Sequence, residues 1–337
     1  MSNIAVIGAG AWGTGLAIVL GRKGTHHVHL WAHETDVCEL INRQRVNERF
    51  LPGRPIPETV SASNDFATVL EGAQIVVSVM PSQHCRGLFE RMRPLIPPQA
   101  LIVSATKGLE EGSLLRMSEV IAASLHQEHP SNIGALSGPS FAQEVARGDP
   151  TAITVASPDR QLLRTVQQEF SDSSFRVYTN SDVAGVELGG SLKNVIAIAA
   201  GICDGLGFGH NSAAALITRG LAEMTRLVVA CGGRAETMAG LAGLGDLVLT
   251  CTGGLSRNRS VGVELGRGKK LPEIIAGMHG MVAEGVFTTT AAVGLAHARG
   301  VEMPITAQMD AILHRGKSPR EAIQELMARS GKSETGG

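Results

Sequence analysis

Near its N-terminus the chain reads IAVIGAGAWGTGLAIVL over residues 4–20. The run 4–7 is apolar, as expected of a buried strand, and a helical pattern follows it. Between them, Gly8, Gly10 and Gly13 form a GxGxxG pattern. In this setting the first glycine makes a tight turn, the second admits a pyrophosphate, and the third lets helix and strand pack closely. The pattern predicts a dinucleotide site, although the glycines could also form only a tight turn without a ligand.

Strands and helices are predicted to alternate over the first 180 residues. Short apolar runs predict strands, and longer segments with helical spacing predict helices. The predicted strands are 4–7, 27–31, 74–80, 100–104, 134–137, 152–156 and 175–178. The predicted helices are 11–22, 64–71, 82–93, 112–126, 140–147 and 158–170. This alternation indicates an α/β domain with a Rossmann-like, doubly wound parallel sheet over residues 1–180.

The strand pattern ends near Asn180. Long segments rich in Ala, Leu and Ile then predict helices at 182–203, 211–231, 258–266, 284–299 and 304–328. Ser181 is expected to cap the first of these helices. We therefore expect an all-helical C-terminal domain over residues 181–330, which carries the substrate and catalytic groups. The polar residues 331–337 are expected to form a frayed tail.

Composition excludes several classes of protein. The 337 residues are 43% hydrophobic, which is enough for two cores. A net charge of −1 and only 3% aromatic residues argue against nucleic-acid binding. The five cysteines stand singly, without the spacing of a zinc site, so we expect reduced thiols and no metal. No signal-like N-terminus and no apolar stretch near 18 residues is present, so we expect a soluble, cytoplasmic protein without membrane insertion.

The residue after the second predicted strand bears on cofactor choice. In an NAD-specific site, an acidic residue about 20 positions after the glycines binds the ribose 2′-hydroxyl. His33 stands near that position, and Glu34 follows it. Because a histidine does not repel a 2′-phosphate as a carboxylate does, we expect NADP(H) to be accepted, with NAD(H) left open. His33 could equally be an ordinary exposed residue at a strand end.

Two polar loops follow strands predicted to end at the carboxyl edge of the sheet, where such folds bind ligands. Lys107 follows the strand at 100–104 and is a candidate for touching nicotinamide or substrate, although a loop lysine is often only solvated. Gly138 and Ser140 follow the strand at 134–137. Ser140 is expected to cap the next helix, with Gln143 completing a capping box. The free N–H groups of that helix start could also bind an anion or a hydroxyl.

Lys193 is set in a ridge of small residues. Counting by fours along the predicted helix gives Gly185, Gly189, Lys193, Ala197 and Gly201. Such a ridge lets another backbone or a ligand come close. A lysine desolvated there has a lowered pKa, as a general acid or base near neutral pH requires. The alternative is plain helix packing, with a lysine that extends its ammonium group to solvent.

Further polar residues follow glycines in the second half. Arg257, within the run Ser256, Arg257, Asn258, suits a phosphate because a guanidinium binds phosphate through two parallel hydrogen bonds. Asp246 could orient Lys193 or bind a substrate hydroxyl. Equally, Asp246 could cap a helix and Arg257 could be solvated. Glu284 stands apart from these residues, and its spacing alone indicates no role.

With these residues in place, the chain resembles the prokaryotic-type NAD(P)-dependent glycerol-3-phosphate dehydrogenases. Order and spacing of the matching segments make the resemblance specific. The segments are GAGAWGTGLA at 8–17, ATKGLE at 105–110, SGPSFAQEV at 137–145, ELGGSLKNVIAIAAGICDGLGFG at 187–209, GLGDLVLTC at 243–251, SRNRSVG at 256–262 and VAEGV at 282–286. Gly15 and Ser191 stand where alanine is expected, which affects no chemical group.

The resemblance implies reversible hydride transfer between NAD(P)H and dihydroxyacetone phosphate, giving sn-glycerol 3-phosphate for phospholipid synthesis. Lys193 is implied to exchange a proton with the C2 oxygen. The residues implied to hold the substrate are Lys107, Gly138, Ser140, Lys193, Asp246, Ser256, Arg257 and Asn258. The residues implied to contact the cofactor, besides Gly8, Gly10 and Gly13, are Ala11, Trp12, His33, Lys107, Ala142, Arg257, Val282 and Glu284.

Two other functions remain open from the sequence. One is a hydroxyacid or sugar-phosphate dehydrogenase of the same two-domain plan, which would act on a 3-hydroxy acid but not on dihydroxyacetone phosphate. The other is a sensor that binds NAD(P) without turnover, against which the joint presence of Lys107, Lys193 and Asp246 speaks. Helices rich in alanine and glycine pack well, so a homodimer is compatible with the sequence, which does not require one.

Overall fold

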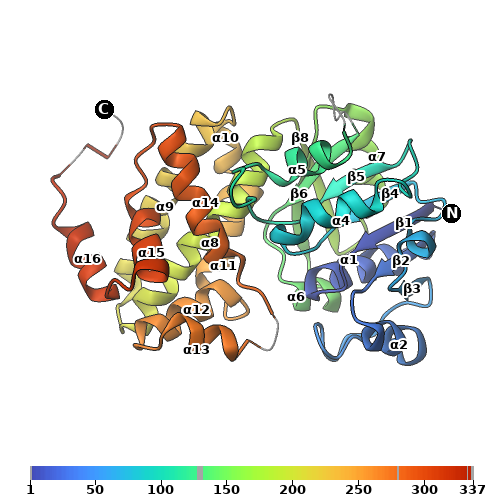
Figure 1. The fold of residues 1–337 in the computed structure, drawn as a ribbon, viewed down its shortest axis with the longest axis horizontal. Helices are drawn as coiled ribbons and strands as arrows, with labels where there is room; N and C mark the ends of the chain where they lie inside the picture. Colours follow the sequence, from blue (N-terminus) through green and yellow to red (C-terminus); the bar gives the residue numbers. More distant parts are fainter. Residues whose placement is uncertain (1, 127–131, 279–280, 332, 335–337) are drawn as a thin grey trace.

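The computed structural model of the chain describes residues 2–126, 132–278, 281–331 and 333–334. It has two halves that lie side by side, one built on a sheet and one made of helices (Figure 1). The strands run in the order β3-β2-β1-β4-β5-β6-β7-β8, and all neighbours are parallel except β6 and β7. The strands are β1 (Ser2–Ile7), β2 (His26–Trp31), β3 (Val60–Ser63), β4 (Ile75–Ser78), β5 (Leu101–Ser104), β6 (Ile133–Ser137), β7 (Thr151–Ala156) and β8 (Phe175–Asn180).

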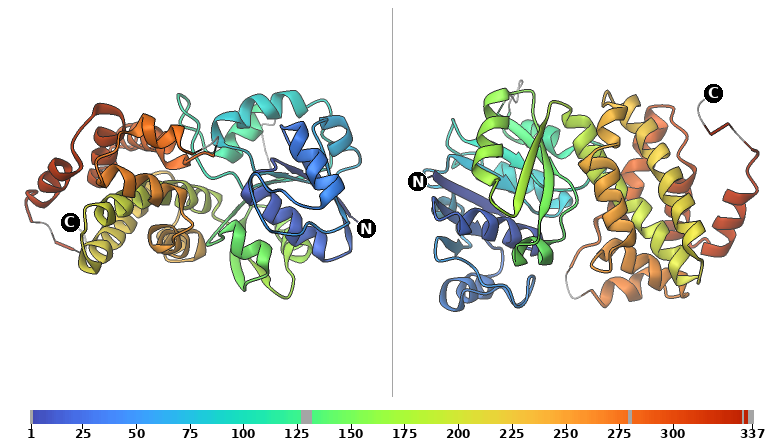
Figure 2. Two further views of the ribbon diagram at one scale, coloured as in Figure 1. Left: turned by 90° about the horizontal axis from the view of Figure 1, so that it is seen from below. Right: turned by 180° about the vertical axis from the view of Figure 1, so that it is seen from behind.

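Helices cover both faces of the sheet (Figure 2). Successive side chains of a strand point to opposite faces, and in β1 Ile4 and Val6 join one core while Ala5 and Ile7 join the other. Both faces are therefore apolar, as a sheet covered on both sides requires. The helices of this half are α1 (Ala11–Arg22), α2 (Thr35–Gln44), α3 (Phe66–Leu70), the short η1 (Ser82–His84), α4 (Cys85–Met92), α5 (Met117–Ser124), α6 (Ala142–Arg147) and α7 (Arg160–Phe170).

The second half is helical, with α8 at its centre. Its helices are α8 (Val183–Gly205), α9 (His210–Ala230), α10 (Ala235–Met238), the π-helical turn η2 (Leu241–Gly245), α11 (Asp246–Thr252), α12 (Arg257–Gly266), α13 (Leu271–Ala276), α14 (Glu284–Ala298), α15 (Pro304–Arg315) and α16 (Pro319–Met327). A Cβ added to Gly201 of α8 would lie 2.0 Å from Arg259 O of α12, and one added to Gly262 would lie 2.0 Å from Ile198 O. The small residues thus let the backbones of α8 and α12 touch, as the packing alternative for this ridge expected, but Lys193 is buried and does not extend its ammonium group to solvent.

Within the described residues, α8 is long and apolar enough to cross a membrane by length and composition alone, as is the bent pair 235–252 and 257–266 if it counts as a single span. In the most apolar window of α8, 94% of the residues are buried inside the structure. Its apolar surface is therefore covered by the surrounding helices, as in the core helix of a folded domain.

Two elements of the first half were not predicted from the sequence. The helix α2 and the strand β3 both lie between the second and third predicted strands. β3 is the edge strand and reads Val-Ser-Ala-Ser, so only two of its four side chains are buried. Such a short, half-polar strand lacks the apolar run on which strand prediction depends. The antiparallel pairing of β6 with β7 also departs from the wholly parallel sheet expected.

Several predicted boundaries are wrong. Asp182, not Ser181, caps α8, because its carboxylate accepts a hydrogen bond from Gly185 N at 2.8 Å. The segment predicted as one helix at 304–328 is two helices, since the chain turns at Gly316, which has φ of +69°. The segment 112–126 is helical only over α5. Of the predicted tail, residues 332 and 335–337 lie outside the described part of the chain.

Candidate functional site

The GxGxxG loop joins β1 to α1, and its three glycines have different surroundings. Gly8 has φ of +121°, and a Cβ there would lie 2.7 Å from Val79 O. A Cβ on Gly13 would lie 1.8 Å from Gly8 O, so α1 packs on the strand only with glycine at this position. A Cβ on Gly10 would meet nothing within 4 Å. The fold itself requires Gly8 and Gly13, whereas Gly10 keeps a space open at the start of α1.

The start of α1 presents free donors to that space. Gly10 is the N-cap residue, and no side chain caps the helix. The first N–H groups of a helix have no partner within it and carry the positive end of its dipole. The indole N–H of Trp12, which follows Ala11 in the first turn, is buried and has no hydrogen-bond partner in the described part of the chain. Open space bounded by free donors at a helix start fits the pyrophosphate of a dinucleotide.

His33 and Glu34 follow β2 at the same edge of the sheet. His33 is exposed, and its ring centroid lies 6.0 Å from that of Trp31. Glu34 Oε1 lies 3.8 Å from a guanidinium nitrogen of Arg49. The charge of the carboxylate is thus partly offset by a nearby cation, and the imidazole itself does not repel a phosphate. Both features favour acceptance of a ribose 2′-phosphate.

The remaining predicted cofactor residues lie at helix starts. A Cβ on Gly15 of α1 would lie 3.6 Å from the Cα of Ala142, so α6 packs against the first turns of α1. Glu284, the first residue of α14, accepts hydrogen bonds from Ser82 N at 3.1 Å and Ser82 Oγ at 2.6 Å. Ser82 follows β4, so Glu284 ties the helical half to the sheet edge. Burial raises the pKa of the Glu284 carboxyl. Val282 lies half-buried just before this helix.

An acid lies between two lysines where the halves meet. Asp246 Oδ2 is 2.6 Å from Lys107 Nζ, and Asp246 Oδ1 is 2.9 Å from Lys193 Nζ. Lys107 Nζ also donates a hydrogen bond to Gly138 O at 3.1 Å. Asp246 is 1% exposed and Lys193 is 6% exposed. The fold therefore brings four of the sequence-predicted residues together in one buried, charged cluster.

The environment of this cluster sets its protonation. Burial lowers the pKa of Lys193 to about 8, and the ammonium group of Lys107 adds to the lowering, while Asp246 opposes it. Burial alone would raise the pKa of Asp246, but the two lysines hold that pKa below its usual value. Asp246 thus stays ionised, and Lys193 can give up or take a proton near neutral pH.

Sequence reasoning missed Thr250 and Asn194. Thr250 Oγ1 accepts a hydrogen bond from Lys193 Nζ at 2.7 Å and donates one to Asp246 O at 2.6 Å. Asn194 Oδ1 accepts from Asn258 Nδ2 at 2.9 Å, and both asparagines are buried. Their positions in the sequence could have indicated them, because Thr250 stands one helical turn after Asp246 and Asn194 directly follows Lys193.

Ser140 does not cap α6, so the predicted capping box is wrong. Phe141 is the N-cap residue, and no side chain caps this six-residue helix. Instead, Ser140 Oγ donates a hydrogen bond to Gly138 O at 2.9 Å. The side chain of Gln143 accepts a hydrogen bond from Arg54 Nε at 3.0 Å and so does not reach back to Ser140. The chain stays extended through Phe141, which delays the helix start.

Ser256 and Arg257 stand at the start of α12. The hydroxyl of Ser256 caps the helix by accepting a hydrogen bond from Arg259 N at 3.2 Å. Arg257 is exposed, and among the described residues its guanidinium group makes no hydrogen bond and no ion pair within 4 Å, although the charge of the Glu284 carboxylate acts on it. Its neighbour Arg259, in contrast, pairs with Asp204 at 2.6 Å. Arg257 is therefore free to bind an anion, whereas Arg259 is already paired.

Residues 2–126, 132–278, 281–331 and 333–334 contain no group of three or more His, Cys, Asp and Glu side chains placed to hold a metal ion.

Comparison with known proteins gives consistent matches along the whole chain. Residues 3–163 match the family of the NAD-dependent glycerol-3-phosphate dehydrogenase N-terminus, and residues 182–324 match the family of its C-terminus. The chain is 66% identical over 334 residues to glycerol-3-phosphate dehydrogenase [NAD(P)+] of Koribacter versatilis, covering 99% of each chain. It is 56% identical to the enzyme of the same name from Acidobacterium capsulatum, covering 99% of this chain and 100% of that one.

A solved structure agrees with these matches. The crystal structure of glycerol-3-phosphate dehydrogenase from Coxiella burnetii superposes with a TM-score of 0.91 at 46% identity, covering 97% of this chain and 98% of that one. Sequence and fold therefore correspond over both halves, including the sheet edge and α8. The chain belongs to the NAD(P)+-dependent glycerol-3-phosphate dehydrogenase family.

Proposed function

We propose that this NAD(P)+-dependent glycerol-3-phosphate dehydrogenase reduces dihydroxyacetone phosphate reversibly to sn-glycerol 3-phosphate, with Lys193 as the proton donor. The observation that carries the proposal is the buried contact of Asp246 with Lys193 at 2.9 Å and with Lys107 at 2.6 Å. A ketone that is reduced develops negative charge on its oxygen, so a proton donor and a nearby cation lower the barrier. The two lysines supply both.

Lys193 would act directly on the substrate. Reduction places a hydride on C2, which the bound nicotinamide cofactor supplies, and a proton on the C2 oxygen. Lys193 donates that proton through Nζ and becomes neutral, which its pKa of about 8 makes accessible. In the reverse direction neutral Lys193 accepts the proton from the C2 hydroxyl. Asp246 and Thr250 orient its ammonium group throughout.

The substrate would lie between the sheet edge and the start of α12. Arg257 binds the phosphate, because its guanidinium is exposed and unpaired in the described structure. Lys107 contacts both the substrate and the nicotinamide. The other residues assigned to the substrate are Gly138, Ser140, Lys193, Asp246, Ser256 and Asn258.

The cofactor would lie along the carboxyl edge of the sheet, with its pyrophosphate on the open start of α1. Gly10 keeps the space for that group clear of side chains. His33 stands at the position of the ribose. The other residues assigned to the cofactor are Gly8, Ala11, Trp12, Gly13, Lys107, Ala142, Arg257, Val282 and Glu284.

The wider role follows from the reaction. Glycerol 3-phosphate made in this way would supply phospholipid synthesis in the cytoplasm. The chain would divide into a cofactor domain over 1–180 and a substrate domain over 181–330. This assignment is supported by the last strand, which ends at Asn180, and by α8, which begins at Val183. A homodimer is compatible with this arrangement.

One assay tests the proposal. Loss of absorbance at 340 nm is followed with dihydroxyacetone phosphate, using NADPH and NADH separately. Turnover with either cofactor supports the proposed reaction, and the ratio of the two rates tests the expectation from His33 that NADPH is accepted. Protein that binds NADPH but shows no turnover with dihydroxyacetone phosphate would contradict it.

A further inference from the structure

Lys107 lies on a loop, so something other than a regular element must fix its position. The loop follows β5, which ends at Ser104, and it runs to Arg116, just before α5. It closes on itself, since Leu109 and Arg116 form an antiparallel bridge and Glu110 N donates a hydrogen bond to Leu115 O at 3.0 Å. The loop is thus one compact unit, and whatever holds its end at Arg116 also holds its start at Lys107.

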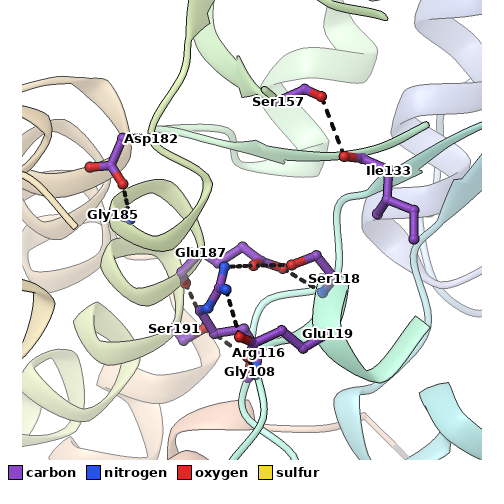
Figure 3. Close-up of polar contacts among 10 residues, drawn as sticks. All are labelled: Gly108, Arg116, Ser118, Glu119, Ile133, Ser157, Asp182, Gly185, Glu187 and Ser191. Atoms are coloured by element: carbon purple, nitrogen blue, oxygen red, sulfur yellow. Dashed lines mark hydrogen bonds and ion pairs between the residues drawn. The ribbon is translucent and has the colours of Figure 1, made fainter. Parts of the chain in front are cut away.

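A buried carboxylate of α8 holds that end (Figure 3). Glu187 Oε1 accepts a hydrogen bond from Ser118 N at 2.7 Å. Glu187 Oε2 accepts hydrogen bonds from Ser118 Oγ at 2.6 Å and from an Arg116 guanidinium nitrogen at 2.8 Å. Arg116 also pairs with Glu119 at 2.7 Å. Glu187 therefore caps the start of α5 from a different helix and neutralises the arginine at the loop end.

The same helix holds the other end of the loop. Ser191, one turn after Glu187, places its hydroxyl 3.1 Å from Gly108 O, and Gly108 directly follows Lys107. Leu109 is fully buried and packs in one core with Leu188 and Leu192 of α8. Polar and apolar contacts from successive turns of α8 thus hold both ends of the 105–116 loop on this helix.

We propose that Glu187 is a positioning residue for Lys107, which holds the 105–116 loop on α8 so that the Lys107 ammonium reaches Asp246. The inference rests on the function proposed above for Lys107. One helix would then carry Lys193 and also fix the second cation of the site. The distance between the two lysines is set by α8 itself and does not depend on the closing of a flexible loop.

This role predicts an effect on Lys193 that a loss of stability alone would not produce. The groups that face Lys193 are Lys107, Asp246, Thr250 and Cys251. Because the ammonium of Lys107 lowers the pKa of Lys193, a loop that moves Lys107 away lets that pKa rise.

The test is Glu187→Gln in the full-length protein. The oxygen of an amide at this position can still accept a hydrogen bond from Ser118. The amide carries no charge, and an NH2 donor replaces its second oxygen, so the ion pair with Arg116 is lost. We expect kcat for dihydroxyacetone phosphate reduction to fall at least about tenfold. The acidic limb of the pH profile for glycerol 3-phosphate oxidation should move up by about half a pH unit. Peptides covering 105–116 should exchange backbone hydrogens faster in deuterium-exchange mass spectrometry.

The matched control is Glu223→Gln. Glu223 is also a buried carboxylate that caps another helix, since it accepts hydrogen bonds from Ile305 N at 2.9 Å and Thr306 N at 2.8 Å of α15. In the described part of the chain, its hydrogen bonds go to α15 and none goes to the 105–116 loop. Its loss should lower Tm but leave the pH profile and the exchange of 105–116 unchanged. A double-mutant cycle of Glu187→Gln with Arg116→Gln should be strongly non-additive, because both residues act through one ion pair.

Several outcomes would overturn the proposal. If Glu187→Gln lowers only Tm, with wild-type exchange at 105–116 and a wild-type pH midpoint, Glu187 merely stabilises the fold. If that variant does not fold, Ser118→Ala replaces it, because this change removes only one hydrogen bond to Glu187. Wild-type hydrogen exchange over 105–116 in Ser118→Ala would also contradict the proposal. Wild-type protein without turnover on dihydroxyacetone phosphate would contradict the proposed function, while the exchange data would still decide whether Glu187 holds the loop.

Discussion

Lys193 Nζ and Asp246 Oδ1 lie 2.9 Å apart, and both side chains are buried at the junction of the sheet and the helices. Asp246 also contacts Lys107, so one carboxylate serves two ammonium groups. Taking charges out of water is costly, and a partner offsets the cost only with good geometry. The cluster therefore leaves Lys193 with a lowered pKa even though an acid is in contact with it.

Lys193→Met should remove the proton donor while keeping an unbranched side chain that is only one atom shorter. We expect kcat to fall by about 10² or more, which is the range for general acid–base groups. Affinity for NADPH, measured by quenching of tryptophan fluorescence, should change little. Steady-state rates at 340 nm check the first expectation, and activity near that of the wild type would remove Lys193 from the catalytic role.

The pH dependence of the two directions should be opposite. Oxidation of glycerol 3-phosphate requires neutral Lys193, so its kcat should rise with pH through a midpoint near 8, the pKa that burial gives this lysine. Reduction of dihydroxyacetone phosphate requires the ammonium form, so its kcat should fall through the same range. Initial rates from pH 6 to 10 in a buffer of constant ionic strength measure both limbs. Limbs with the same sign would contradict the assignment.

Gly10→Ala should weaken cofactor binding without harming the fold. A Cβ at this position meets no protein atom within 4 Å, so Tm should stay at the wild-type value. The methyl group would occupy the space assigned to the pyrophosphate, and we expect Kd for NADPH to rise about tenfold or more. Gly87→Ala in α4, where a Cβ also meets nothing within 4 Å, is the control and should bind NADPH normally. Equal affinity in both variants would refute this location of the pyrophosphate.

Arg257→Ala should act mainly on the phosphate substrate. Hydrogen bonds to charged groups contribute roughly 1.5–3 kcal/mol, so KM for dihydroxyacetone phosphate should rise by roughly 10- to 100-fold. Arg259→Ala removes a neighbouring arginine that is already paired with Asp204 at 2.6 Å, and KM should then change little. Saturation curves for both variants distinguish the two arginines. An unchanged KM in Arg257→Ala would rule out a phosphate-binding role.

His33→Asp should shift the preference toward NADH. A carboxylate beside a 2′-phosphate is repulsive, and like-charge contacts of this kind cost several kcal/mol. We expect the ratio of kcat/KM for NADPH to that for NADH to fall at least about tenfold. His27→Asp makes the same change at an exposed position near the other end of β2 and should leave the ratio unchanged. If both variants keep the wild-type ratio, His33 does not contact the ribose.

Much of the fold could be predicted because its signals are local. The glycine loop, the apolar strands and the long helices each produce their pattern within about 20 residues of sequence. The misses were β3, whose residues are small or polar, and helices of at most ten residues, namely α2, α10, α11 and α13. Helix starts were also missed, such as that of α6, where Phe141 and not Ser140 ends the extended chain. A cap depends on which side chain reaches the free N–H groups, and several candidates stood side by side in the sequence.

The sequence by itself determined the dinucleotide loop, the division into a sheet half and a helical half, and the identity of the charged residues, because these follow from local periodicity and residue chemistry. Only the tertiary structure decided that Lys107 and Asp246, 139 positions apart, lie 2.6 Å from each other. It also decided that Lys193 is buried and so has a lowered pKa. Burial and charge proximity depend on how distant segments pack, and α8 sets that packing by contacting both the 105–116 loop and α12.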